Sequence, residues 1–319
     1  MAPTMRAVQY DRFGSAEVLK VRDLPLPALK NGHVLVKVLA TAIEGVDISA
    51  RTGKLKLIVR GPFPRGAGHS FTGEVSRVAP DVTEYAASER VWGSLPPAAV
   101  KGIGAAAQYV AVPIAHLAHL ANSLDPEQAA GLTGVAPAAI KALRHKAQLK
   151  AGERVLVRGA AGGLGAAMVQ YAHALGAKVV GLAAAKDLDN VRTLGAGEVY
   201  DYRKVDIKTL GKFDVIVDCV GDQLRAYRRL LARGGRMMEM AASRPAELAY
   251  VAFSIVHGTR RVRFLLVPPT RALLDEVSLA VEAGQLRPVV DKVFDLEDIV
   301  EAHRAQESRV GFGRRIVTV

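Results

Sequence analysis

The feature that most constrains the fold of this chain is a glycine-rich segment between two apolar stretches. Residues 154–158 form a short apolar run typical of a strand, glycines stand at 159, 162 and 165, and Met168, Tyr171 and Leu175 follow at helical spacing. Glycines at this spacing permit a tight turn, let the backbone approach a diphosphate, and allow a helix to pack closely on a strand. The segment predicts a strand–turn–helix unit that binds a dinucleotide.

The cofactor contacts expected in this turn are Gly159, Ala160, Gly162, Gly163, Leu164 and Gly165. Unpaired amide groups and the helix dipole would hold the diphosphate without a cationic side chain. A glycine-rich turn can also serve packing alone, and its context separates the two interpretations. Here the turn lies within a repeated strand–helix pattern, which favours dinucleotide binding.

Strands and helices alternate through the second part of the chain. We expect strands near residues 154–158, 178–183, 198–200, 215–218, 236–240, 263–267 and 314–319, and helices near residues 163–175, 187–194, 223–232 and 272–283. Between residues 154 and 240 this alternation predicts a parallel sheet with helices on both faces.

The first part of the chain has a different pattern. Residues 6–113 show short β-branched runs broken by glycine and proline, which predict a compact, mainly β unit. Helical patterning begins where Asp125 can cap a helix and Pro126 can occupy its first position. We therefore place a domain boundary near residue 122.

The end of the second strand of the expected sheet bears on cofactor choice. About twenty residues beyond the glycine turn, NAD-binding proteins usually carry an acid that binds the ribose hydroxyls. This chain has alanines at 183–185, then Lys186, and its first acid is Asp187. NADPH is therefore favoured over NADH, and Lys186 either contacts the 2′-phosphate or is a solvated residue at a helix start.

Charge and cysteine content limit the partners and the compartment. The chain has 43 basic and 31 acidic residues, a net charge of +12, which favours anionic partners such as phosphorylated cofactors or nucleic acid. No nucleic-acid motif accompanies the scattered basic residues, so a solvated surface is favoured over nucleic-acid binding. The single cysteine, Cys219, excludes an internal disulfide and a multi-cysteine zinc site. Without a secretory signal or a long apolar run, we expect a cytoplasmic protein with no membrane partner.

Beyond the glycine turn, short segments carry a resemblance that runs the length of the chain. They lie at residues 5–8, 13–14, 17–19, 32–38, 68–75, 195–203, 213–221, 286–291 and 302–303. In this order they resemble the quinone oxidoreductase family, related to zeta-crystallin, within the medium-chain dehydrogenase/reductase superfamily. So many ordered matches are more specific than the glycine turn alone.

The resemblance implies an α/β protein with two domains. A GroES-like β domain would contain residues 1–122 and 258–319, and a Rossmann domain with a doubly wound parallel sheet would contain residues 123–257. The family also implies a homodimer.

The resemblance also implies site residues. Tyr202 would lie near the adenosine phosphate with Lys186, although it could be an ordinary residue at a strand end. Asp47 matches a family aspartate whose role can be structural. Thr133 matches a family threonine near the nicotinamide or the substrate.

Departures from the zinc-dependent relatives argue against a metal site. Those relatives carry a cysteine ligand near residues 43–47 and a His-Glu pair where this chain has His69 and Ser70, and no cysteine precedes Cys219 here. Catalytic zinc needs three converging protein ligands, so we expect none. His69 is more readily a hydrogen-bonded structural residue.

Glu44 departs from the quinone oxidoreductase pattern, which usually has asparagine at this position. Its carboxyl group would act either as a proton relay or as part of a polar rim. We assign Glu44, Asp47 and Thr133 as candidate catalytic residues. The basic stretch at residues 54–60 either recognises an anionic group or is a solvated loop.

These residues favour an NADPH-dependent reductase of quinones or α,β-unsaturated carbonyls. Without zinc, such acceptors are easier substrates than alcohols, because the incoming charge is delocalised onto an oxygen that modest hydrogen-bond donors can stabilise. A pathway-specific enoyl reductase, for example in polyketide tailoring, is an alternative. An NADPH-binding protein that binds nucleic acid is a less favoured one.

Overall fold

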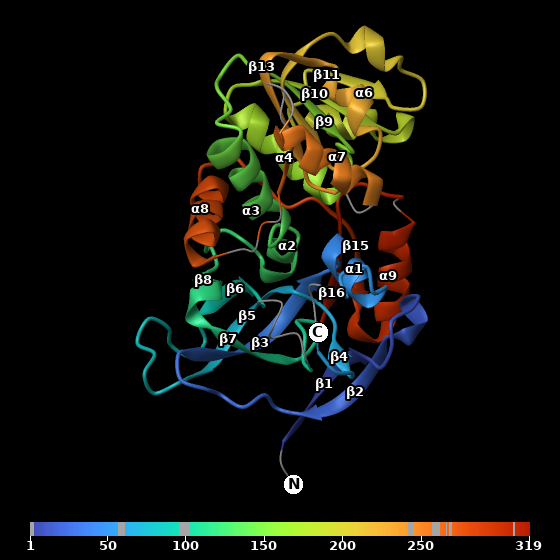
Figure 1. The fold of residues 1–319 in the computed structure, drawn as a ribbon. Helices are drawn as coiled ribbons and strands as arrows, with labels where there is room; N and C mark the ends of the chain where they lie inside the picture. Colours follow the sequence, from blue (N-terminus) through green and yellow to red (C-terminus); the bar gives the residue numbers. More distant parts are fainter. Residues whose placement is uncertain are drawn as a thin grey trace.

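The computed structural model describes residues 3–56, 61–95, 102–241, 245–256, 262–265, 267, 270–308 and 310–319. A parallel sheet with its helices lies at one end of the molecule, and antiparallel strands lie at the other (Figure 1). No helix in these ranges is long and apolar enough to cross a membrane.

The parallel sheet contains six of the described strands. In spatial order they are β11 (Glu198–Asp201), β10 (Lys178–Ala183), β9 (Arg154–Arg158), β12 (Phe213–Asp218), β13 (Leu231–Glu239) and β14 (Val262–Phe264). Numbered along the chain, this is the 3-2-1-4-5-6 order of doubly wound dinucleotide folds. The order reverses between β9 and β12, and such folds bind ligands beyond the carboxyl ends of the strands at that point.

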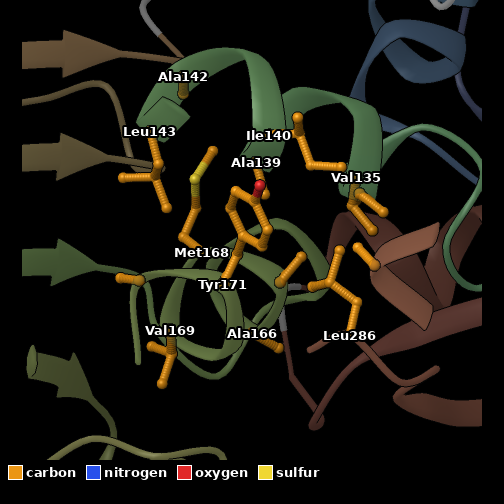
Figure 2. Close-up of a cluster of buried hydrophobic side chains, with 14 of the residues drawn as sticks. Val135, Ala139, Ile140, Ala142, Leu143, Ala166, Met168, Val169, Tyr171 and Leu286 are labelled. Carbon is orange, nitrogen blue, oxygen red and sulfur yellow. The ribbon is translucent and has the colours of Figure 1, made fainter. Parts of the chain in front are cut away.

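The helix α4 (Gly163–Ala174) connects β9 to β10 and is buried over most of its surface. It packs against α3 (Val135–Ile140) and the helical turn Lys141–Lys146, and Figure 2 shows Met168 and Tyr171 directed toward Ile140 and Leu143. All four side chains are almost completely buried. Burial of each large apolar side chain stabilises the fold by roughly 1.5–3 kcal/mol, so the start of α4 is held firmly at the end of β9.

Seven strands form the larger sheet of the second domain within the described residues. Six follow the order β15 (Val290–Asp295), β16 (Arg314–Thr318), β3 (His33–Ala42), β5 (Ser70–Val78), β6 (Arg90–Ser94) and β8 (Leu117–His119), and β7 (Tyr109–Pro113) also pairs with β3. β16 runs antiparallel to β3, with Ile316 opposite Ala42. The end of the chain therefore returns to the β domain, as the family resemblance implied.

The remaining elements complete both domains. A small sheet joins β2 (Lys20–Pro25), β1 (Thr4–Tyr10) and β4 (Arg65–Gly66). The other helices are α1 (Gly45–Arg51), α2 (Pro126–Ala130), α5 (Leu188–Thr193), α6 (Leu224–Arg228), α7 (Pro245–Val256), α8 (Arg271–Glu282) and α9 (Ile299–Glu307). The expected α/β class, with a parallel-sheet domain and a β domain, is confirmed.

The helix α2 begins as its sequence predicts. The Asp125 carboxylate accepts a hydrogen bond from the Gln128 amide at 3.0 Å, and Pro126 occupies the first helical position. The Thr72 hydroxyl donates to the Pro126 carbonyl at 2.7 Å. This helix, which follows the expected domain boundary, is therefore bonded directly to β5 of the β domain.

Two expected elements differ in the structure. The helix expected at residues 223–232 is only α6, because Leu231 already begins β13 and lies opposite Phe213 of β12. The strand β14 lies beyond the expected boundary at residue 257 and still belongs to the parallel sheet, with Arg263 opposite Met238. Three residues are too few to show a periodic pattern that would assign β14 to either domain.

Candidate functional site

The glycine turn after β9 has two glycines that the fold itself requires. Gly159 has a φ of 71°, in the left-handed region that favours glycine. A Cβ atom on Gly165 would lie 2.0 Å from the Gly159 carbonyl oxygen. Both residues allow α4 to start close against the end of β9.

Gly162 occupies a different environment in the same turn. Its φ is −73°, and a Cβ atom there would meet only the Gly159 carbonyl oxygen among the described residues, at 3.5 Å. Neither the backbone conformation nor the packing requires glycine at this position. A ligand that approaches the backbone would require it, which supports the diphosphate site expected from the sequence.

The start of β16 lies against this turn. The Gly313 amide donates to the Ala161 carbonyl at 3.0 Å. The Arg314 side chain crosses Gly163, where an added Cβ atom would lie 2.1 Å from Arg314 Cδ. A guanidinium group on a buried stem therefore lies beside the N-terminus of α4, where the dipole and the free amides also favour an anion.

Arg314 connects the turn to a polar cluster that consists of Glu44, Ser70, Thr133 and Arg314. Arg314 Nη2 lies 3.2 Å from Glu44 Oε1, and their side chains are only 7% and 16% exposed. Glu44 Oε1 also accepts from the Ser70 hydroxyl at 2.8 Å, and the Thr133 hydroxyl lies 2.8 Å from that of Ser70. Two of the three candidate catalytic residues, Glu44 and Thr133, thus lie in one hydrogen-bonded cluster.

A glycine beside Thr133 makes this cluster possible. A Cβ atom on Gly134 would lie 2.0 Å from Glu44 Oε1. The Glu44 carboxylate therefore packs directly against the backbone at the N-terminus of α3.

The third candidate, Asp47, is buried in the first turn of α1. Its Oδ2 accepts from the Glu44 amide at 2.7 Å, and its Oδ1 is hydrogen-bonded to His69 Nδ1. Burial raises the pKa of Asp47, but the charge and the hydrogen bond of His69 outweigh burial and lower it overall. The pKa of His69 shifts in the opposite direction. Burial lowers it, but Asp47 and then Glu44 raise it above the ordinary value.

A second histidine lies near this pair. His303 on α9 is 1% exposed, and both of its ring nitrogens lack a hydrogen-bond partner among the described residues. Burial lowers its pKa to about 4, against a smaller opposing effect of Asp47. His303 is therefore neutral at physiological pH.

The expected phosphate contacts lie on the other side of the glycine turn. The Ala160 amide donates to the Leu182 carbonyl at 3.0 Å, which connects the turn to β10. The Tyr202 amide donates to the Ala183 carbonyl at 3.1 Å, so Tyr202 lies at the carboxyl end of β10, where the exposed Lys186 follows. The Arg203 guanidinium lies 5.2 Å from the Tyr202 ring centre and adds a second cation.

Two other regions do not contribute to this site as the structure describes it: the basic stretch at residues 54–60 and a depression beside α8. Residues 57–60 of the basic stretch lie outside the described residues. An open depression of about 700 Å³ beside α8 is lined by Glu89, His119 and Asp275 among others, and contains none of the expected site residues.

Sequence reasoning missed Ser70 and Arg314 as members of the cluster. Arg314 was visible only as the start of a closing strand, and it pairs with Glu44 across 270 residues of chain. In the sequence, Ser70 stands out only because the zinc-dependent relatives have glutamate at its position. No local pattern in the sequence shows that Glu44 and Arg314 pair. The only usable signal is that Glu44 replaces the usual asparagine and therefore needs a partner for its charge.

The residues at this site do not fit a catalytic zinc ion. The Glu44 carboxylate binds Ser70 and Arg314, and the Asp47 carboxylate binds the Glu44 amide and His69. No group of three His, Cys, Asp or Glu side chains in the described part of the chain could hold a metal ion. Tetrahedral zinc needs at least three such ligands with free lone pairs.

Comparisons with known families agree with both domains. Residues 30–122 match the alcohol dehydrogenase GroES-like domain. Residues 194–317 match the family described as zinc-binding dehydrogenase. The first match covers most of the β domain, and the second spans the later strands of the parallel sheet and the return to β16.

Individual relatives cover nearly the whole chain. A quinone oxidoreductase of Sus scrofa is 31% identical over 94% of this chain and 93% of its own length. An NADPH-dependent alkenal/one oxidoreductase of Arabidopsis thaliana is 30% identical over 98% of this chain and 79% of its own length. The crystal structure of Escherichia coli quinone oxidoreductase complexed with NADPH superposes with a TM-score of 0.87 at 25% identity, and covers 98% of this chain and 100% of that one. The chain therefore belongs to the quinone oxidoreductase family within the medium-chain dehydrogenase/reductase superfamily.

Proposed function

We propose that the protein is a zinc-independent reductase that uses NADPH to reduce quinones or α,β-unsaturated carbonyl compounds. The observation that carries this proposal is Gly162, a glycine that the fold does not need, in a turn directly beside the Glu44–Arg314 pair. A dinucleotide on this turn would therefore bind next to a set of hydrogen-bonding side chains. The relatives named for NADPH-dependent alkenal and quinone reduction support the same function.

Two separate groups of residues would bind the diphosphate and the 2′-phosphate of the cofactor. The amides of the turn and the N-terminus of α4 would hold the diphosphate, and Arg314 would add positive charge beside it. Lys186, Tyr202 and Arg203 would hold the 2′-phosphate at the carboxyl end of β10.

NADPH, when bound, supplies a hydride. The Ser70 hydroxyl donates to Glu44 and the Thr133 hydroxyl donates to Ser70, so either hydroxyl would turn from this partner to donate to the oxygen on which negative charge develops. Charge delocalised over a conjugated acceptor needs no stronger stabilisation, whereas the oxidation of an alcohol usually relies on a metal ion.

We expect turnover with quinones, linear enones or cyclic enones and little or none with alcohols. The measurement is steady-state consumption of NADPH with each conjugated acceptor, set against formation of NADPH from NADP with primary and secondary alcohols. Efficient oxidation of alcohols without reduction of any conjugated acceptor would contradict the proposal.

The same assay after prolonged chelation tests zinc independence. Activity should not change, because Glu44 and Asp47 are occupied by other partners. Elemental analysis showing about one zinc ion per chain, with activity lost on its removal, would contradict the proposed zinc independence.

Lys186→Ala is expected to weaken binding of NADPH roughly tenfold and to leave NADH binding nearly unchanged, because one charged contact of this kind is worth about 1–2 kcal/mol. Titration of each cofactor by nicotinamide fluorescence measures both. Lys178→Ala is a matched control, since Lys178 is an exposed lysine at the amino end of the same strand, β10. Equal losses for NADPH and NADH would show that Lys186 does not bind the phosphate.

We also propose that two copies associate along β14. This strand pairs with β13 on one side and is an edge strand in the described part of the sheet. Phe264 on β14 and Phe253 on the adjacent α7 are 41% and 55% exposed. Exposed edges that carry apolar side chains favour pairing with another strand. Sedimentation velocity should give the mass of a dimer, and a monomer at micromolar concentration would contradict the proposal.

A further inference from the structure

The Asp47–His69 pair has the geometry of a positioned proton donor. Asp47 Oδ1 holds His69 Nδ1, and the other carboxylate oxygen is fixed by the Glu44 amide at 2.7 Å. The His69 carbonyl accepts from the Leu95 amide at 2.7 Å. Both the ring and the backbone of His69 are therefore held in one orientation.

The second ring nitrogen of His69 remains available. Nε2 makes no hydrogen bond to any of the described residues, while 10% of the side chain is still exposed. Because most buried polar side-chain atoms have a hydrogen-bond partner, an unbonded Nε2 on a partly accessible ring is available to a ligand. The next residue, Ser70, belongs to the cluster with Glu44 and Thr133 beside the glycine turn.

The charges around His69 favour its protonated form. Asp47 and Glu44 face it, and together they raise its pKa against the effect of burial. Arg314 faces Glu44, while His303 faces Asp47 with Arg51 nearby. His303 cannot take the same role, because its pKa of about 4 leaves it without a proton to donate at neutral pH.

We propose that His69 Nε2 donates the proton that completes reduction of the acceptor, with Asp47 as its positioning residue. This inference rests on the proposed function. The hydride forms a C–H bond at the β-carbon, and the electron pair of the double bond moves to the carbonyl oxygen as an enolate. The Nε2–H bond then breaks, the proton joins the α-carbon of the enolate, and neutral His69 takes a new proton from water.

The key variant is His69→Asn, which keeps a donor for Asp47 and loses the titrating ring. Reduction of a simple enone should slow by about 100-fold or more, the usual contribution of a general acid. An alkylidene 1,3-diketone is the matched control substrate, because its reduction product is a stable enolate that needs no proton. With this substrate the variant should stay within about threefold of the wild type.

The pH dependence gives a second readout. The wild-type kcat for the enone should fall as pH rises through the raised pKa of His69, and His69→Asn should lack this descending limb. Asp47→Asn removes the carboxylate that raises this pKa, so its descending limb should move to lower pH.

The outcomes separate this inference from the proposed function. Wild-type protein that reduces neither substrate would refute the proposed function. Wild-type activity on the enone that persists in His69→Asn would refute only the proton donor. Equal slowing with both substrates would also refute it, because a distorted site would affect hydride transfer itself.

Discussion

Gly162→Ala is expected to fold as stably as the wild type and to bind NADPH about 100-fold more weakly, a loss of roughly 2.7 kcal/mol. The first part follows from the open space at Gly162 and its ordinary φ of −73°. The second follows because a methyl group there would occupy the space through which a diphosphate reaches the backbone amides. Fluorescence titration measures the binding, and thermal unfolding without cofactor measures the stability.

Two other glycines serve as comparisons for this prediction. Gly165→Ala should lower the stability itself by about 1–3 kcal/mol, because the new Cβ atom would lie 2.0 Å from a backbone oxygen. Gly197→Ala should change neither property, since its nearest neighbour is the Val179 carbonyl oxygen at 3.9 Å. If Gly162→Ala retained wild-type affinity for NADPH, the turn would serve packing alone.

Local sequence patterns predicted the glycine turn more completely than the rest of the site. The strand Arg154–Arg158 and the helix after Gly162 follow from apolar spacing and from the glycines at 159, 162 and 165. The cap at Asp125 follows from the same kind of short-range rule. These contacts join residues that are neighbours in the chain.

The polar cluster depends on distant parts of the chain. Glu44 precedes α1, Ser70 begins β5, Thr133 precedes α3 and Arg314 begins β16. The family resemblance identified Glu44 as unusual but left its role open between a proton relay and a polar rim. The pairing with Arg314 depends on the position of β16 beside β3. For His69 the sequence favoured a hydrogen-bonded structural residue, and the structure supplies Asp47 as the partner at one ring nitrogen.

Buried His303 should make the folded protein less stable as the solution becomes more acidic. Its pKa is about 4 in the folded protein and 6.5 without burial, so between these values the unfolded chain binds more protons than the folded one. Stability must then fall as pH decreases through this window, by about 2–3 kcal/mol between pH 7.5 and pH 4.5 from this group alone. His69 changes the stability at pH values above this window, because its pKa in the folded protein is raised from 6.5. Asp47 changes the stability at pH values below the window, because its pKa in the folded protein is lowered from 3.8.

His303→Leu should remove this dependence, since leucine fills the buried site without a titrating group. Urea unfolding at pH 7.5 and pH 4.5 gives the free energy of unfolding for both proteins, and the loss on acidification should be about 2–3 kcal/mol smaller in the variant. His173→Gln is the control, because it removes an exposed histidine on α4, and this variant should lose as much stability on acidification as the wild type. An equal loss in His303→Leu and the wild type would mean that His303 already takes up a proton in the folded state, and its buried ring would then need a hydrogen-bond acceptor such as Asp47.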